Sequence, residues 1–398
     1  MSPLELSVFN HSEATTNSIR KILAQLEKEE RIRVNLTVIP WQGGWARMVN
    51  VALYGEGFDI SEIGSTWVGD FVKMDALSPF SPADLRVIGM EKDFLPASWS
   101  SGTTKTGEGQ AIHWAIPWSA DTRVIYYRRD WLARAGIDET TAFVTPAAFD
   151  QTLTRLKASG VEIPLTLPVE RSRQNVHNLA SYVWGAGGGF LSPDGRKVLF
   201  DSPEALTGMK NFFQLGRHLA PQVQNLGEGA SEQHFTSGLS AVTISGTWVP
   251  TQNFAPGVWE HVGTAPVPGV SWVGGSNFVI WKNCLLKREA ARAIQYLTSG
   301  TLSHLVYPSV GLPTRLVNLN TPTYMTDPHW RVMREALLNG RAFPTEQLWG
   351  LIESRLTDLL PFIWRKVLTE PQTPIEKILD QFIVPLVTRL GLTLSARH

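Results

Sequence analysis

The apolar and polar positions in the first third of the chain follow two different periods. Leu4–Phe9 and Ile32–Ile39 are short runs rich in β-branched and apolar residues, which predicts strands. Thr16–Glu30 instead repeats its apolar residues every three to four positions, which predicts an amphipathic helix. The same order continues with helix Trp45–Tyr54, strand Ile60–Ile63 and helix Val68–Met74. Strands that alternate with helices in this way predict an α/β fold with a parallel sheet.

The segments that follow these strands are Asn10–Glu13, Pro40–Trp45 and Gly64–Trp67, and each is polar, glycine-bearing or aromatic. Ligands of parallel sheets bind beyond the carboxyl ends of the strands. The pattern therefore predicts that ligand-contacting side chains lie in these loops.

Two further strands are expected at Ala111–Trp118 and Thr122–Tyr127, with Ser119–Asp121 as a polar corner between them. Pro117 has no N–H to donate to a neighbouring strand, so the first of these strands is expected to change course near it.

Most of the remaining chain reads as helix. Asp130 is expected to cap a short helix that Gly136 ends, and residues 146–270 are predicted to be mainly helical. The tail from Asp327 reads as three helices separated by Pro344, Pro361 and Pro371–Pro374.

The amino-acid composition narrows the range of possible functions. A chain of 398 residues is too long for one ordinary core, so two or three compact units are expected. It has 36 basic and 36 acidic residues without a long run of either sign, which disfavours partners such as nucleic acid or anionic lipid. The single cysteine, Cys284, excludes an intrachain disulfide, and its apolar neighbours predict a buried, inert thiol. Nine scattered histidines show no metal-ligand spacing, so we expect no metal and no cofactor.

Several blocks of sequence, taken in order, resemble one known family. Ile116–Trp118, Asp121–Arg123 and Tyr126–Asp130 are similar to the first interlobe crossing of the extracellular solute-binding proteins (family 1) of sugar-importing ABC transporters, with maltose-binding protein as a distant relative. Further blocks in the family's order are Phe58–Ile60 (with Phe58 where the family usually has proline), Leu77–Phe80, Thr145–Phe149, Trp184–Phe190, Val198–Ala205, Phe235–Trp248, Ala265–Gly269 with Gly274–Ser276, and Gly311–Thr314.

The resemblance implies a periplasmic-binding-protein-like fold: two discontinuous α/β lobes joined by a three-strand hinge, with ligand held in the cleft between the lobes. The N-terminal lobe is expected to comprise residues 1–118 and 276–314. The C-terminal lobe is expected to comprise residues 119–275 and 315–398, with a helical tail from about 327.

The resemblance also implies a carbohydrate ligand, whose ring C–H groups pack on aromatic faces and whose hydroxyls bond to polar side chains. The expected aromatic residues are Trp67, Trp248, Trp41 and Trp349. Asp121 matches the hinge carboxylate that relatives use on the ligand, and an ion pair with Arg123 is its alternative role. The other expected polar contacts are Glu13, His11, Ser65, Thr66, Ser276, Asn277 and Asn178, followed by Asn10, His177 and Glu170.

The implied function is capture of a sugar or oligosaccharide and its delivery to the membrane permease of an ABC transporter, by a monomer located in the periplasm or outside the cell. Residues 1–20 lack a basic and apolar leader, so a leader removed before an added Met1 is expected, with a lipid anchor as a further option. No catalytic motif is present, and no enzyme activity is expected. Three alternatives stay open: a non-sugar solute such as a glycerophosphodiester or polyamine, a receptor that feeds a sensor kinase, and a glycosidase that uses Asp121 with Glu13 or Glu170.

Overall fold

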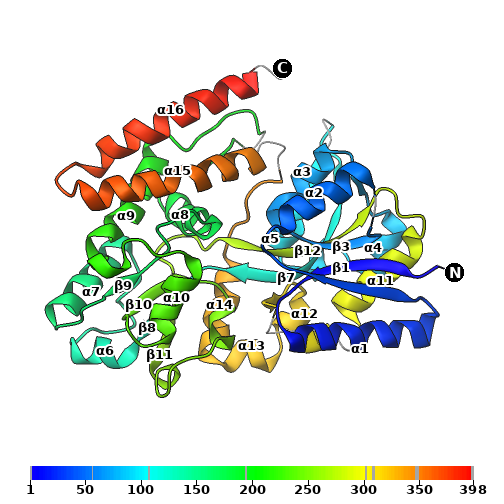
Figure 1. The fold of residues 1–398 in the computed structure, drawn as a ribbon, viewed down its shortest axis with the longest axis horizontal. Coiled ribbons are helices and arrows are strands. Elements are labelled where there is room, and N and C mark those ends of the chain that lie inside the picture. The colour runs from blue at the N-terminus through cyan, green and yellow to red at the C-terminus, as the bar shows by residue number, and fades with distance from the viewer. Residues whose placement is uncertain are drawn as a thin grey trace. The chain divides into compact units, whose positions relative to one another are not determined.

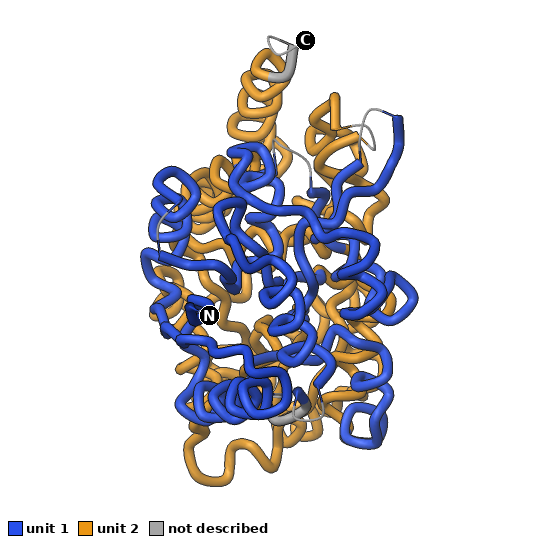
Figure 2. The backbone as a smooth tube through the Cα atoms, turned by 90° about the vertical axis from the view of Figure 1, so that its right-hand side faces the viewer, with its two compact units in different colours: residues 1–122, 273–327, 342–350 blue, residues 123–272, 328–341, 351–398 orange. Residues whose placement is uncertain are grey.

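The chain forms two compact units, each assembled from segments that lie far apart in the sequence. The structure is a computed structural model that describes residues 2–55, 57–105, 108–192, 195–300, 303–306, 310–345 and 349–395. Unit 1 comprises residues 1–122, 273–327 and 342–350, and unit 2 comprises residues 123–272, 328–341 and 351–398 (Figure 2). Met1, for which the sequence analysis expected an artificial origin, lies outside the described residues.

Unit 1 is built on a seven-stranded sheet in the order β13, β7, β12, β3, β1, β2, with β4 paired to β12. β1 runs parallel to β2 and to β3, which confirms the predicted parallel sheet, whereas β12 is antiparallel to β3 and to β7. The strands are β1 Leu4–Phe9, β2 Val34–Ile39, β3 Ile60–Gly64, β4 Leu77–Ser78, β7 Ala115–Thr122, β12 Val273–Trp281 and β13 Leu312–Pro313, beside the separate pair β5 Thr103–Lys105 and β6 Ala111–His113.

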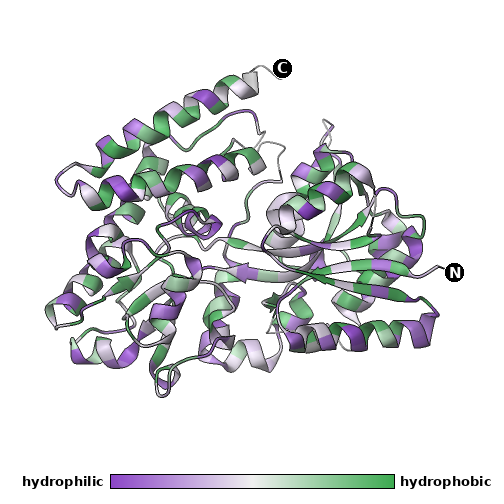
Figure 3. Cartoon of the chain, viewed as in Figure 1, coloured by the Kyte–Doolittle hydropathy of each residue, from purple (hydrophilic) through white to green (hydrophobic). Residues whose placement is uncertain are grey.

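Helices cover both faces of this sheet: α2 and α3 lie on one face, and α1 and α11 on the other (Figure 1). α1 shows why they form. The Ser12 hydroxyl caps its first turn by accepting the Thr15 N–H, and Ile19, Ile22 and Leu26 form its buried stripe. Figure 3 shows the resulting alternation of apolar and polar colour along α1. The helices of unit 1 are α1 Glu13–Glu30, α2 Gly44–Tyr54, α3 Val68–Lys73, α4 Pro82–Ile88, α5 Pro96–Ser101, α11 Lys287–Ser299, α12 Leu316–Leu319 and α13 Pro322–Thr326.

Unit 2 has a smaller sheet in the order β11, β8, β10, β9 and a larger share of helix. β8 is antiparallel to both β10 and β11. Its strands are β8 Val124–Arg128, β9 Leu165–Thr166, β10 Val242–Ser245 and β11 Val262–Pro266. Its helices are α6 Arg129–Arg134, α7 Pro146–Ala158, α8 Arg173–Gly185, α9 Pro203–Phe213, α10 Glu228–Thr236, α14 Pro328–Leu338, α15 Trp349–Thr369 and α16 Ile375–Ser395.

The predicted polar corner at Ser119–Asp121 is wrong, because β7 runs through it to Thr122. β12 pairs with β7 on one side and β13 on the other, so the backbone groups of this segment are used in the sheet. The strand does change course near Pro117: the register with β12 shifts between Ser276 and Asn277, which leaves Trp118 as an extra residue on β7.

Two predicted helix boundaries are also wrong. Asp130 does not cap α6, whose N-cap is Arg128; its carboxylate instead accepts two hydrogen bonds from the Arg128 guanidinium, at 2.9 and 2.7 Å. Pro361 lies inside α15 rather than ending a helix. The buried Trp364 packs edge-on against Phe212 and Phe213 of α9, and this packing offsets the backbone hydrogen bond that proline removes.

The division of the chain differs from the expected one. Residues 315–327 and 342–350, expected in the C-terminal lobe, belong to unit 1, and the chain passes between the units after Thr122, Trp272, Asp327, Arg341 and Gly350 rather than in three crossings. The contacts explain this. The Arg315 guanidinium donates to the Ile88 carbonyl and lies over Phe94, and the Thr345 hydroxyl donates to the Ser100 carbonyl at 2.9 Å.

Among the described residues, no helix is long and apolar enough to cross a membrane, and no group of three or more His, Cys, Asp or Glu side chains could hold a metal ion. Cys284 is buried as predicted, and burial raises the pKa of its thiol to about 12, so it stays protonated at neutral pH.

Candidate functional site

In unit 1, aromatic side chains gather at the carboxyl ends of β1, β2 and β3. The Trp41 indole, just after β2, stacks on the Phe9 ring with centroids 3.9 Å apart and an interplanar angle of 14°. Phe9 is buried, whereas Trp41 is 43% exposed. His11 meets the Trp41 ring edge-on at 5.7 Å. This arrangement, which we call the Trp41 corner (Phe9, His11, Trp41), presents an indole whose orientation is set by an apolar ring beneath it.

A buried glutamate organises the base of the Trp41 corner. Glu62 on β3 is fully buried, and its carboxylate accepts hydrogen bonds from the Phe9 N–H at 2.7 Å, His11 Nε2 at 2.9 Å and the Ser276 hydroxyl at 2.6 Å. Ser119 Oγ lies 2.9 Å from Ser276 Oγ and extends this hydrogen-bonded network. Because a buried carboxylate requires several donors, these bonds hold His11 and the end of β1 in place.

The other predicted residues of unit 1 take different positions. Trp67 is only 5% exposed and belongs to the apolar core with Phe71 and Trp281, so it supports Trp41 edge-on at 6.2 Å rather than presenting its own face. Asn277 is buried and donates to Ser101 Oγ at 3.2 Å. Asp121 is half-buried on β7, opposite Gly274.

Glu13 and Asn10 are exposed on the first loop, beside the half-buried His11. Glu13 is the first residue of α1, where a carboxylate interacts favourably with the positive end of the helix dipole. The structure therefore brings His11 and Ser276 together on Glu62, with Trp41 against His11, while Glu13 occupies a helix start.

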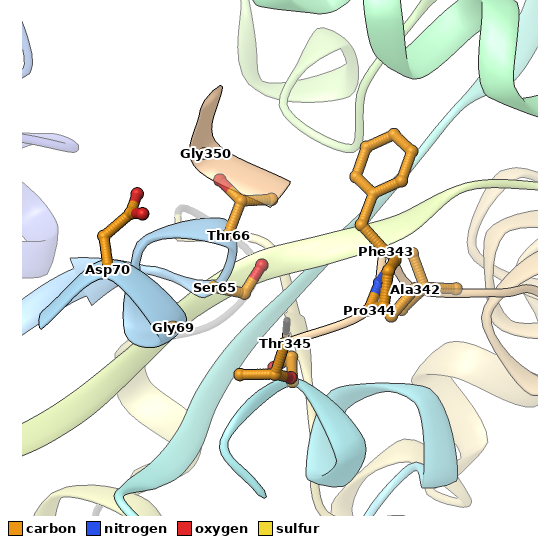
Figure 4. Close-up of a pocket in the computed structure, with 11 residues that line it drawn as sticks. Ser65, Thr66, Gly69, Asp70, Ala342, Phe343, Pro344, Thr345 and Gly350 are labelled. Atoms are coloured by element: carbon orange, nitrogen blue, oxygen red, sulfur yellow. The ribbon is translucent and has the colours of Figure 1, made fainter. Parts of the chain in front are cut away.

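Ser65 and Thr66 line a small pocket with Asp70, Phe343, Pro344 and Thr345 (Figure 4). Its volume is about 10 Å³, which is room for one water molecule and not for a sugar ring. The Asp70 carboxylate lies against Gly350 of the same unit, where an added Cβ would come within 2.0 Å of it, so the glycine permits this close approach. Trp349, beside it, is fully buried and stacks on Phe343 at 3.9 Å, which does not leave the indole face open as the sequence analysis expected.

In unit 2, Trp248 is half-buried and its indole is held from several sides. Its Nε1–H donates to both carboxylate oxygens of the buried Glu232, at 3.0 Å each. Glu232 also accepts from the Ser245 hydroxyl and from Gln252 Nε2 at 2.8 Å. The six-membered ring lies over Gly246, where a Cβ would come within 2.1 Å of it, so the glycine of the Gly-Thr-Trp segment is required for this rotamer.

A second group of side chains packs behind Trp248. The Arg123 guanidinium lies over the Trp248 ring at 5.1 Å and over the Trp272 ring at 4.7 Å, and donates to His177 Nδ1 at 3.0 Å. His177 stacks on Trp272 with centroids 3.8 Å apart. We call these residues, with Glu232, the Trp248 cluster (Arg123, His177, Glu232, Trp248, Trp272).

Asn178, predicted as a ligand contact, is fully buried in α8, and neither polar atom of its amide has a hydrogen-bond partner among the described residues. Gln174 and Tyr182 share its stripe one turn before and after it. Burial raises the pKa of the Tyr182 phenol well above its usual range, so the stripe is an uncharged polar seam inside unit 2. Glu170 is exposed before α8.

Several of these residues gave little or no signal in the sequence. Glu62 did carry a signal: it is the charged residue of the strand Ile60–Gly64, whose other residues are apolar or small, and a charged residue buried in a strand must have partners. Glu232 sits on a helix with nothing to mark it, and its pairing with Trp248 spans sixteen residues.

A model of the bacterial extracellular solute-binding protein family matches residues 12–299, well over half of the chain. The chain belongs to this family. It is 24% identical over 268 residues to the diacetylchitobiose-binding protein DasA of Streptomyces coelicolor, an alignment that covers 64% of this chain and 59% of DasA. The chain thus matches less than two thirds of the length of that relative.

Solved structures share the fold of this solute-binding protein. The sugar-binding protein MalE of Xanthomonas citri superposes with a TM-score of 0.81 at 20% identity and covers 100% of this chain and 98% of its own. Maltose-bound MalE3 of T. maritima gives a TM-score of 0.76 at 21% identity, covering 99% of this chain and 100% of its own. These similarities confirm the predicted periplasmic-binding-protein-like fold.

Proposed function

We propose that this solute-binding protein is the carbohydrate receptor of an ABC importer. One observation carries the proposal: each unit presents a tryptophan that remains partly open, Trp41 and Trp248, and each indole is braced from behind. Rigid aromatic faces bind the apolar side of a sugar ring, and bracing removes the entropy cost of orienting them at binding. The sugar-binding names of the relatives support the same ligand class.

Two polar side chains are candidates for binding sugar hydroxyls. His11 borders Trp41, and Asp121, half-buried on β7, retains the carboxylate that the family resemblance points to. Both can bind hydroxyls: a carboxylate accepts two bonds, and the neutral His11 ring, whose Nε2–H donates to Glu62, keeps Nδ1 as an acceptor. We assign His11 and Asp121 to the ligand, with Glu13 as an outer contact.

Calorimetric titration against a panel that includes diacetylchitobiose, maltose and simple monosaccharides tests this function. Trp41→Ala and Trp248→Ala are each expected to weaken binding of the tightest sugar about 30-fold, the loss of roughly 2 kcal/mol typical of an aromatic anchor. Tyr54→Ala and Trp131→Ala are matched controls: both remove accessible aromatic rings, one per unit, and should leave affinity unchanged. Normal affinity in both tryptophan variants would contradict the proposal.

We expect the protein to release its ligand without changing it chemically, because the family consists of binding proteins. Chromatography of oligosaccharides after prolonged incubation should show intact chains. Release of shorter sugars that Asp121→Asn abolishes would instead support the glycosidase alternative.

Delivery to a membrane permease, from the periplasm or the cell surface, follows for an extracellular solute-binding protein. We propose that the protein acts as a monomer, and that uptake of the bound sugar into proteoliposomes carrying the cognate importer depends on it.

A further inference from the structure

The Trp248 ring is fixed on one side by hydrogen bonds and on another by a buried cation. Glu232 holds the indole N–H, while Arg123, only 3% exposed, packs its guanidinium against the ring. Val124 pairs with Ser245 at the end of the β8–β10 ladder, so Arg123 and Gly246 are the residues just beyond the two paired strand ends. The sheet register therefore delivers Arg123 to the place where the ring lies over Gly246.

Arg123 is in turn clamped. Its guanidinium lies over the Trp248 ring and over the Trp272 ring, at 5.1 and 4.7 Å from their centroids, and a desolvated cation gains most from such contacts. Trp272 is buried and anchored, because its backbone N–H donates to Ser181 Oγ of α8 at 3.2 Å. The guanidinium thus contacts both an aromatic residue anchored to α8 and the half-buried Trp248.

His177 completes the clamp through a defined tautomer. Arginine N–H groups only donate, so His177 Nδ1, 3.0 Å away, must accept with its lone pair. The ring proton of the neutral imidazole is then on Nε2, which faces Glu353 Oε1 of α15 at 3.4 Å. Arg173 Nε lies 3.8 Å from the other oxygen of Glu353. The chain of contacts runs from α15 through His177 and Arg123 to the Trp248 ring.

We infer that Arg123 is a positioning residue for Trp248, and that His177 and Glu353 hold Arg123 in the required place. The expected effect of this positioning on sugar affinity rests on the proposed function, whereas the positioning of the Trp248 ring does not. The role assigned to Arg123 is to set the angle of the indole: its guanidinium lies over the Trp248 and Trp272 rings, and its NH2 group donates to His177.

Fluorine NMR of protein labelled with 5-fluorotryptophan tests the positioning without any ligand. The Trp248 resonance is assigned as the one that Trp248→Phe removes. Arg123→Gln is expected to shift and broaden it as the ring gains other orientations, while the Trp131 resonance stays in place. Arg134→Gln is the matched control, since Arg134 lies over the Trp131 ring at 5.7 Å and should move only that resonance. An unchanged Trp248 resonance in folded Arg123→Gln would overturn the inference.

Two His177 variants separate the hydrogen bond from packing and remain informative if Arg123→Gln fails to fold. His177→Phe keeps a ring to stack on Trp272 but has no acceptor for Arg123; His177→Asn keeps an acceptor near the Nδ1 position but loses the stack. The inference expects the Trp248 resonance to shift in His177→Phe and to be largely restored in His177→Asn. The opposite order would show that His177 only fills space, and would overturn its assigned role.

Calorimetric titration with diacetylchitobiose and maltose then measures how this positioning affects sugar affinity. For each probe that the wild type binds, Arg123→Gln is expected to lower the affinity roughly tenfold. In the Trp248→Ala background the same substitution is expected to have no further effect. A further loss in that background would mean that Arg123 acts on the sugar directly, which contradicts positioning. If the wild type binds neither probe, the fluorine spectra still decide the positioning, and only the ligand class fails.

Discussion

The two accessible tryptophans are held by different physics. Trp41 in unit 1 rests on the flat face of Phe9, and its buried glutamate, Glu62, acts one step away through His11. Trp248 in unit 2 is bonded directly to its buried glutamate, Glu232, and stacked on a buried cation. An apolar stack can slide with little penalty, whereas a buried carboxylate or guanidinium that loses its partner leaves an unpaired polar group. The comparison indicates an adaptable indole in unit 1 and a rigid one in unit 2.

The largest expected effect separates the two tryptophans of unit 1. Trp67→Ala should lower the free energy of unfolding by about 3–5 kcal/mol, because it empties a core position between α3 and the sheet. Trp41→Ala should change stability little, since nearly half of its surface is already exposed. Urea unfolding of both variants measures the difference. Equal stability losses would show that Trp41 is itself a core residue.

The next effect compares the two buried glutamates. Glu62→Gln and Glu232→Gln each place an amide N–H₂ where an N–H that can only donate, that of Phe9 or of the Trp248 indole, now meets a carboxylate, so each should lower the free energy of unfolding by about 1–3 kcal/mol. Only Glu232→Gln should also weaken sugar binding strongly, because it touches an indole directly. Urea unfolding combined with calorimetric titration distinguishes them, and equal affinity losses would remove the contrast between the two sites.

A smaller effect tests the apolar support of Trp41. Phe9→Leu keeps an apolar side chain beneath the indole but removes the ring–ring stack, which is worth about 0.5–1.5 kcal/mol. Sugar affinity is expected to fall about threefold to tenfold, with no effect on a ligand analogue that binds independently of Trp41. The matched variant Phe235→Leu, in the core of unit 2, should leave affinity unchanged. A full thirtyfold loss in Phe9→Leu would mean that Trp41 is as rigid as Trp248.

The smallest expected effect concerns acid sensitivity. Burial lowers the pKa of His218 in unit 2 and of His113 in unit 1 below the ordinary value of about 6.5. Near that pH the unfolded chain binds a proton on each imidazole that the folded protein does not. The free energy of unfolding is therefore highest above about pH 6.5 and falls as the pH drops towards the lowered folded pKa.

His218→Asn should flatten this slope more than His113→Asn, because His218 is the more deeply buried of the two. Chemical unfolding at a series of pH values between 5 and 8 measures both slopes, with the exposed His261→Asn as control. A steeper slope in either variant would reverse the assigned sign.

Much of the fold is decided locally, and the sequence by itself determined it. Period-two and period-3.6 patterns placed β1, α1, β2 and α2, because each element must bury one face, and the chain order of the motifs revealed the family. The sequence also drew attention to His11 and Trp41, which lie in loops after predicted strands, and to Trp248, which the family resemblance pointed to.

Only the tertiary structure decided which of these side chains remain accessible and what holds them. The sequence could not distinguish the open Trp41 from the buried Trp67 and Trp349, because burial depends on what packs above a residue, here α3 and Phe343. It could not foresee that β13 covers the edge of β7 and removes the polar corner at Ser119–Asp121. Nor could it pair Trp248 with Glu232, or Arg123 with His177, since these contacts join distant segments and depend on the register of β8 with β10 and on where α8 and α10 pack.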